Sequence, residues 1–196
     1  MSEFKEIEFK NVLTEEEYEK LVKYFKLTDQ DCFEQLNIYF DTKDLELHKK
    51  KIALRTRIKN DAIELTLKQK TSTCMLETTD LITFSDLDIL LLNHTLPKGE
   101  VLSKLETLNI YESLYEIARL KTIRYEFEYL DNLIALDKSL YYGFVDYEIE
   151  LETKDYDYGK SVFLKLLSIF NITRNKPKNK IERAFQYKKS SDKSET

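Results

Sequence analysis

The sequence predicts an α+β fold in which antiparallel strands are flanked by helices. Several short runs alternate polar and apolar residues, and tight turn signals join neighbouring runs, as in an antiparallel sheet. Other runs repeat their apolar residues at helical spacing. The 196 residues, of which 42% are hydrophobic and 34% charged, have the length and composition of one globular domain. We therefore expect a single domain over residues 1–187 and a flexible tail over residues 188–196.

The first part of the chain predicts a strand, a helix and an antiparallel meander. Residues 4–12 alternate with period two, which predicts a strand. Thr14 and three following glutamates are typical of a helix N-terminus, and apolar residues then recur at helical spacing as far as residue 26. Strand-forming residues predict three further strands, at 36–41, 51–59 and 62–70.

The second part predicts two helices that interrupt the sheet and then a return to strands. The leucine and isoleucine spacing at 84–92 and at 101–118 favours helices. Alternating runs separated by turn residues predict three more strands, at 120–130, 133–139 and 144–153. Apolar residues at helical spacing over 158–170 predict a covering helix.

Composition excludes several classes of function. With 31 basic and 36 acidic residues the net charge is −5, which is the wrong sign for a general nucleic-acid binder. No apolar run is long enough to cross a membrane, and the first residues lack the apolar core of a secretory signal, so we expect a cytoplasmic protein without a membrane partner. Because only 3 glycines are present, and no glycine-rich phosphate loop, side chains would have to hold any bound phosphate.

Carboxylates line one face of the predicted strand at 144–153. Period-two alternation puts these four on the same side: Asp146, Glu148, Glu150 and Glu152. A second acidic row appears at Glu6 and Glu8, and carboxylate oxygens without nearby Cys or His suit Mg²⁺ or Mn²⁺. A solvent-exposed sheet face would show the same alternation, so the pattern by itself leaves both interpretations open.

Cationic side chains line neighbouring strands in the same way. Arg55 and Arg57 share one strand face, and Arg124 offers a third guanidinium from a later strand. Planar guanidinium groups match phosphate oxygens, although lysine-rich strands also serve as solubilising edges. A polyanion held both by arginines and by a metal on carboxylates requires the two rows to face one cavity, which a closed barrel with a polar lumen would supply.

Ordered motifs carry a resemblance to a known family. The run Glu6-Ile7-Glu8-Phe9-Lys10 resembles the N-terminal Glu-x-Glu-x-Lys signature of the CYTH, or triphosphate tunnel metalloenzyme, superfamily. Further matches follow in family order: Tyr39-Phe40-Asp41-Thr42, Leu54-Arg55-Thr56-Arg57, Glu64-Leu65-Thr66-Leu67-Lys68, Arg124, Leu136-Asp137, Tyr147-Glu148-Ile149-Glu150 and Lys180. The matches span residues 4–185, and the chain is most similar to the small single-domain bacterial branch.

The resemblance implies an eight-stranded antiparallel β-barrel, a triphosphate tunnel with flanking helices, that hydrolyses a triphosphate with Mg²⁺ or Mn²⁺. It implies these metal ligands: Glu6, Glu8, Asp137, Glu148 and Glu150. It implies these phosphate-binding residues: Lys10, Arg55, Arg57, Lys68, Arg124 and Lys180. Among them Glu6, Lys10 and Arg57 are the expected catalytic residues. A one-residue slip would exchange Lys180 with a neighbouring cation, either Lys176, Lys178 or Arg183.

Three functions remain open for such a site. An inorganic triphosphatase acting on tripolyphosphate needs only the two rows of charge, and we favour it. An adenylate cyclase or a thiamine triphosphatase would also need a wall that holds a ring. A non-catalytic module that binds polyphosphate or a nucleotide would need the metal carboxylates to be missing or blocked. The expected partner is thus a small triphosphate, with no nucleic acid, and the protein is expected to be a monomer or a homodimer.

Overall fold

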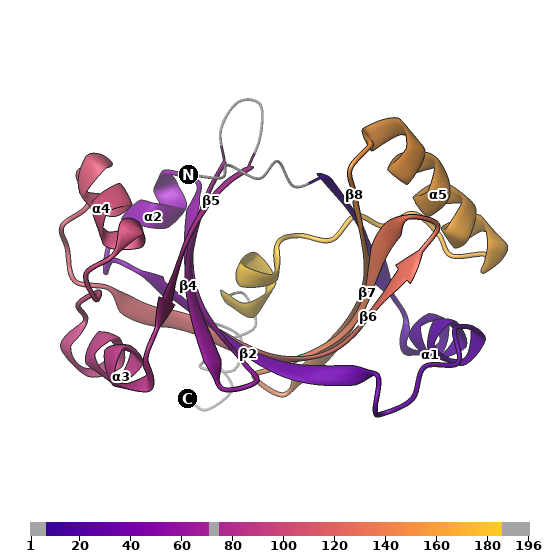
Figure 1. Ribbon diagram of the computed structural model, residues 1–196, viewed down its shortest axis with the longest axis horizontal. Coiled ribbons are helices and arrows are strands. Elements are labelled where there is room, and N and C mark those ends of the chain that lie inside the picture. Colours follow the sequence, from indigo (N-terminus) through magenta and orange to yellow (C-terminus); the bar gives the residue numbers. More distant parts are fainter. Residues whose placement is uncertain (1–6, 71–74, 186–196) are drawn as a thin grey trace, which may run out of the picture. The chain divides into compact units, whose positions relative to one another are not determined.

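The computed structural model describes residues 7–70 and 75–185, and it confirms eight antiparallel strands with flanking helices (Figure 1). The described residues fall into two compact units that interleave along the sequence. The first unit holds residues 35–70, 75–120 and 184–185, and the second holds residues 7–34 and 121–183. A single domain over 1–187 stays a prediction, and the tail predicted at 188–196 lies outside the described residues.

The first unit contains one antiparallel sheet and the helices that cover it. The strands follow each other in the order β2 (Cys32–Asp41), β3 (Ile52–Lys59), β4 (Ala62–Lys70) and β5 (Met75–Ile82). The helices are α2 (Glu46–Lys49), α3 (Phe84–Asn93) and α4 (Glu100–Thr107). Asn60 and Asp61, between β3 and β4, have φ angles of 48° and 63°, as a tight hairpin turn requires. These residues form the turn between the two strands that the sequence predicts at 51–59 and 62–70.

Alternation along β3 and β4 separates an apolar face from a polar one. Leu54 and Leu65 are fully buried in the core of the first unit, together with Leu90 of α3 and Leu105 of α4. Polar side chains of β3 and β4 therefore lie on the sheet face opposite these helices.

The second unit has the same layered arrangement. Its strands follow the order β1 (Ile7–Leu13), β8 (Phe144–Thr153), β7 (Asn132–Tyr141) and β6 (Tyr115–Tyr129), of which β6 enters the unit at Lys121. Helices α1 (Glu15–Tyr24) and α5 (Tyr156–Ile169) cover one face of this sheet (Figure 1). The core contains Leu21 of α1, Phe163 of α5 and Ile149 of β8. A further helical segment spans residues 180–185.

The predicted start of α1 is confirmed in detail. The Thr14 hydroxyl accepts a hydrogen bond from the Glu17 backbone N–H at 3.1 Å, and the Glu17 carboxylate accepts one from the Thr14 N–H at 2.8 Å. This reciprocal capping box satisfies two donors that the first helical turn leaves without partners.

Two parts of the sequence interpretation are wrong. The helix predicted over 101–118 ends at Thr107, since Asn109 adopts a left-handed backbone conformation with φ 56° and β6 begins at Tyr115. Strand β5 was not predicted at all. Among residues 7–70 and 75–185, no helix combines the length and apolar character needed to cross a membrane.

Candidate functional site

The sheet of the second unit has a charged face opposite α1 and α5. The strand register sets Asp137 of β7 beside Glu148 of β8, and Lys10 of β1 beside Glu150 of β8. Glu148 is 1% exposed and Glu150 is 4% exposed. A solvent-exposed acidic face, the alternative left open by the sequence, is therefore wrong for these two carboxylates.

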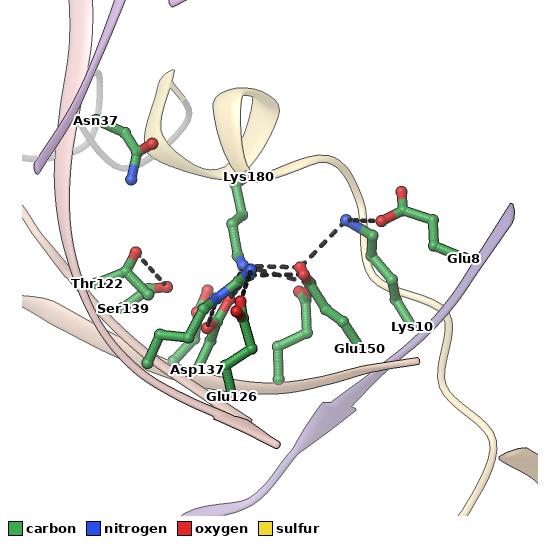
Figure 2. Close-up of polar contacts among 12 residues, drawn as sticks. Glu8, Lys10, Asn37, Thr122, Glu126, Asp137, Ser139, Glu150 and Lys180 are labelled. Carbon is green, nitrogen blue, oxygen red and sulfur yellow. Dashed lines mark hydrogen bonds and ion pairs between the residues drawn. The ribbon is translucent and has the colours of Figure 1, made fainter. Parts of the chain in front are cut away.

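Lys180 places one ammonium group among three of these carboxylates. Its Nζ donates to Oε1 of Glu150 at 2.9 Å and to Oδ2 of Asp137, and it lies 3.7 Å from Oε1 of Glu148. Figure 2 shows Lys180 reaching this group from the C-terminal helical segment. Burial alone would lower the pKa of Lys180, but the surrounding carboxylates outweigh burial and raise it. The ammonium group is therefore fully charged at neutral pH.

Arg124 and Lys10 complete the charge balance around Glu150. Arg124 donates to both carboxylate oxygens of Asp137, at 2.7 and 2.8 Å, and to Oε2 of Glu150 at 2.6 Å. Lys10 Nζ lies 3.1 Å from Oε1 of Glu150 and 2.9 Å from Oε2 of Glu8. Burial favours the neutral acid, yet Lys180, Lys10 and Arg124 together hold the pKa of Glu150 well below its usual range.

Glu148 differs from its neighbour. Burial raises the pKa of Glu148 to about 7; the Lys180 ammonium opposes this rise, and the charge of Glu150 adds to it. Its Oε2 accepts a hydrogen bond from Arg183, whereas its Oε1 is buried without a hydrogen-bond partner among the described residues. A buried oxygen without a partner is uncommon in folded proteins and indicates a place for a ligand or a water molecule.

A second cationic face belongs to the first unit. Arg57 Nε donates to Oδ1 of the buried Asn37 at 3.1 Å, and Lys68 forms an ion pair with Glu77. The Nε of Arg55 is buried and has no hydrogen-bond partner within the described part of the chain. These cations share the polar face of the β2–β5 sheet, as their positions in the alternating strands predict.

The structure thus places the predicted site residues in two groups. The second unit brings these together: Lys10, Arg124, Asp137, Glu148, Glu150 and Lys180. Glu8 lies at the margin of that group, where it pairs with Lys10. The first unit carries Arg55, Arg57 and Lys68, while Glu6 lies outside the described residues.

Two charged residues of this cluster were named in the sequence analysis but were not assigned to the site. Asp146 shares the acidic face of β8, and Arg183 contacts both Asp146 and Glu148. Residues three apart on a helix lie on one face, so Arg183 follows Lys180 to the same acidic cluster. That spacing could have identified Arg183 as a companion of Lys180 rather than as its alternative.

The donor chemistry of this cluster fits a divalent metal. Asp137, Glu148 and Glu150 offer only carboxylate oxygens, which hard cations prefer, and Oε1 of Glu148 lacks a hydrogen-bond partner among the described residues. As they stand, no three acidic, histidine or cysteine side chains in residues 7–70 and 75–185 form a group that could hold a metal ion. The Lys180 ammonium already lies among these carboxylates, so a bound metal would have to take its place.

Comparisons with known proteins agree with the motif order. The sequence model of the CYTH domain family matches residues 5–185. A protein of Bacillus subtilis (strain 168) named "Putative triphosphatase YjbK" is 40% identical over 193 residues, which cover 97% of this chain and 100% of that protein. The crystal structure of a "putative adenylate cyclase" from Bacillus halodurans is 34% identical, with a TM-score of 0.89 over 94% of this chain and 100% of that one.

A solved structure with lower sequence identity shares the same fold. The structure of a "putative adenylyl cyclase" from Hippeastrum is 20% identical and has a TM-score of 0.79, covering 92% of this chain and 95% of that chain. Family match, relatives and the ordered motifs all extend over nearly the whole sequence. The chain therefore belongs to the CYTH domain family.

Proposed function

We propose that this chain hydrolyses a triphosphate, most simply inorganic tripolyphosphate, with Mg²⁺ or Mn²⁺. The observation that carries the proposal is the buried cluster of the second unit, where Lys10, Arg124 and Lys180 surround Asp137 and Glu150. Such a cluster offers cations to phosphate oxygens and carboxylates to a divalent metal. The triphosphatase name of the Bacillus subtilis relative supports the same activity.

Binding would exchange the ion pairs of the cluster for contacts with substrate. Lys10, Arg124 and Lys180 would donate hydrogen bonds to phosphoryl oxygens, and the planar guanidinium of Arg124 can contact two oxygens at once. The carboxylates released from these cations would then hold the metal, with Glu148 and Glu150 as its main ligands. A bound Mg²⁺ or Mn²⁺ would neutralise charge on the phosphoryl oxygens.

Hydrolysis requires water to attack the terminal phosphorus. The new bond joins the water oxygen to phosphorus, the bond to the bridging oxygen breaks, and pyrophosphate leaves with the electron pair while a proton passes to solvent. Lys10, Arg124 and Lys180 stabilise the charge that spreads over the phosphoryl oxygens as this bond breaks. We assign orientation of the water to Glu6, in keeping with the family motif.

The cations of the first unit are proposed as further phosphate ligands. Arg57 is held through its Nε by Asn37, which fixes the plane of its guanidinium group. The buried Nε of Arg55 lacks a hydrogen-bond partner among the described residues, so an anionic oxygen would satisfy it. We include Lys68 with them because it lies on the same sheet face.

Adenylate cyclase activity is a second candidate, favoured by the name of the Bacillus halodurans structure. Such a reaction would draw the ribose 3′-hydroxyl onto the α-phosphorus, and it needs groups that hold adenine in addition to the charges. Tripolyphosphate hydrolysis needs only the charges. Tripolyphosphate hydrolysis therefore requires fewer binding groups from this chain than adenylate cyclase activity does.

One incubation separates these functions. The purified chain would be mixed with tripolyphosphate, ATP or thiamine triphosphate, each with Mg²⁺ or Mn²⁺, and the products followed by phosphorus NMR. We expect orthophosphate and pyrophosphate from tripolyphosphate, at a higher rate than product from either other compound. Cyclic AMP as the main product from ATP would support the cyclase instead, and no product from any compound would reject both enzymes.

A further inference from the structure

We infer that Arg183 is a positioning residue that acts through Glu148. It donates from Nη2 to Oε2 of Glu148 and from Nη1 to Oδ2 of Asp146, at 2.5 Å for the second contact. Its side chain is 11% exposed and that of Glu148 is 1% exposed, so these contacts are shielded from water. The family motif assigns no role to Arg183, and the inference rests on the proposed function only in giving Glu148 a metal.

Arg183 is itself held in place. Asp146 accepts hydrogen bonds from Arg183 and from the Tyr141 hydroxyl, and both Tyr141 and Asp146 belong to the β7–β8 hairpin. The guanidinium group is therefore anchored to the sheet on one side and bonded to Glu148 on the other. A planar group that is hydrogen-bonded at two edges has little freedom to rotate. It therefore also restricts the rotation of the Glu148 carboxylate to which it is bonded.

The consequence for Glu148 lies in which oxygen it presents. Because Arg183 occupies Oε2, the oxygen without a hydrogen-bond partner among the described residues is Oε1, which lies 3.7 Å from the Lys180 ammonium. This is the position that a metal would take when it replaces Lys180. Arg183 thus selects the carboxylate oxygen that faces the cation position.

Lys180 and Arg183 lie on the same short helical segment but contact different carboxylates. Lys180 and Arg183 lie three residues apart, so the same segment delivers both to the carboxylates. Lys180 contacts Asp137 and Glu150, whereas Arg183 contacts Asp146 and Glu148. The first cation has to change partner when a metal binds, while the second can keep its contacts and hold Glu148 still.

The decisive variant is Arg183→Lys, because it keeps the charge and loses the planar fork that joins two carboxylates. Outer partners of a metal ligand typically contribute 10- to 100-fold to metal affinity or activity. We expect Arg183→Lys to bind Mn²⁺ roughly 10-fold more weakly, measured from the electron paramagnetic resonance signal of the free ion without substrate. With tripolyphosphate and saturating Mn²⁺ we expect kcat to fall at least about 10-fold, with a much smaller change in KM.

Three further variants separate the positioning role from a general effect on folding. Asp146→Asn removes the charge that anchors Arg183 and leaves Glu148 itself unchanged, and it should lower Mn²⁺ affinity as Arg183→Lys does. The double variant, with both Arg183→Lys and Asp146→Asn, should bind Mn²⁺ no more weakly than the weaker-binding single variant. The reason is that both substitutions act on the same contact between Arg183 and Glu148. Arg119→Lys is the control for the substitution itself, since Arg119 also forms a guanidinium fork, with one bond of 2.6 Å, but on the single carboxylate of Glu116, at an exposed position of the first unit.

The outcomes distinguish this inference from the proposed function. Wild-type Mn²⁺ affinity and rate in Arg183→Lys would overturn the positioning role. A loss that follows the unfolded fraction, or that Arg119→Lys reproduces, would also overturn it by showing a general effect on the fold. A wild-type chain that binds Mn²⁺ but releases no phosphate would overturn the proposed function alone, while the Mn²⁺ measurements would still decide the role of Arg183.

Discussion

The ammonium nitrogen of Lys180 lies 2.9 Å from Oε1 of Glu150, so a lysine of the C-terminal helical segment neutralises a carboxylate of β8. The lysine side chain is 15% exposed and the glutamate side chain is 5% exposed. In such surroundings water does little to screen either charge. The loss of Lys180 would therefore leave the buried Glu150 with less compensating charge, that of Lys10 and Arg124.

Replacing Lys180 by methionine should destabilise the fold strongly. Breaking a buried ion pair from one side costs roughly 3–5 kcal/mol, and here Asp137 and Glu150 would each lose one of their cations. Urea denaturation in EDTA should show this decrease in the free energy of unfolding. Lys20→Met is the control, because the pair of Lys20 with Glu16 is exposed to water and should contribute little to stability.

The same variant should respond more strongly to Mg²⁺ than the wild-type chain. With the ammonium removed, the carboxylates keep their charge and gain room for a divalent cation. Thermal denaturation with increasing Mg²⁺ should therefore raise the melting temperature of Lys180→Met by more than that of the wild type. Equal shifts in both proteins would place the metal away from Lys180.

Glu148 should make stability depend on pH. Its pKa rises from an ordinary value of 4.5 to about 7 in the folded chain, so between these values the folded state holds more protons than the unfolded state. Stability contributed at this position is present below about pH 4.5 and is lost as the pH rises to about 7. Relative to the wild type, Glu148→Gln should gain on the order of 2 to 3 kcal/mol between pH 4.5 and pH 8. Metal-free denaturation curves at both pH values test this, and a constant difference would contradict the raised pKa.

Glu150→Gln should abolish turnover while the fold remains. The amide keeps the size of the side chain but loses the charge that would hold a metal and orient the surrounding cations. We expect kcat to fall by more than the roughly 10- to 100-fold that the loss of an outer partner of a metal ligand typically causes. Glu152→Gln, two residues further along the same strand face, provides the comparison. Activity that survives excess EDTA would reject the metal assignment altogether.

Arg57→Lys tests the cationic face of the first unit. The substitution keeps the charge but removes the Nε that donates to Asn37 and with it the fixed fork. The value of kcat/KM for tripolyphosphate should fall by roughly 10-fold or more. Calorimetry would show whether phosphate binding persists. Unchanged affinity together with an unchanged rate would place Arg57 outside the site.

Anions should stabilise the chain in the order of their length. A ligand that binds only the folded state raises stability by mass action, by about 2.7 kcal/mol at 100 times its Kd. In the proposed binding mode tripolyphosphate would contact more cations than pyrophosphate, and orthophosphate would contact the fewest. Increases in melting temperature that are largest with tripolyphosphate and smallest with orthophosphate would support a specific phosphate-binding site. The same small shift for all three anions would indicate a diffuse basic surface.

Alternation in the sequence predicted most strands because each sheet has one apolar and one polar face. Strand β5 escaped prediction because it lies beside residues 71–74, which carry no strong turn signal, and its threonines give little contrast between faces. The predicted helix at 101–118 failed because its apolar residues do not all belong to one helix. Ile110 and Leu114 are buried beyond the end of α4, after the chain turns at Asn109.

For the site, the same alternation predicted which side chains share a face and could not predict how deeply they are buried. The burial of Glu150 depends on Arg124 and Lys180, which lie 26 and 30 positions away along the chain. Periodicity within one strand carries no information about such partners. The family motifs supplied Lys180, and Arg183 entered only as an alternative to it because those motifs name a single C-terminal cation.

The pairing of β1 with β8 has a consequence for how the protein assembles. Lys10 and Glu150 are 140 positions apart, and the backbone of Val12 also bonds to Asn175. Contacts between positions so far apart in the sequence form slowly. Closing the long loop between them costs conformational entropy before the contacts can stabilise the folded state. During synthesis the first strand of this unit must therefore wait for its partner until most of the chain has left the ribosome. Over that interval the unpaired edge of this strand can pair with strands of other chains and aggregate. We therefore expect slow refolding, with a higher yield at low protein concentration.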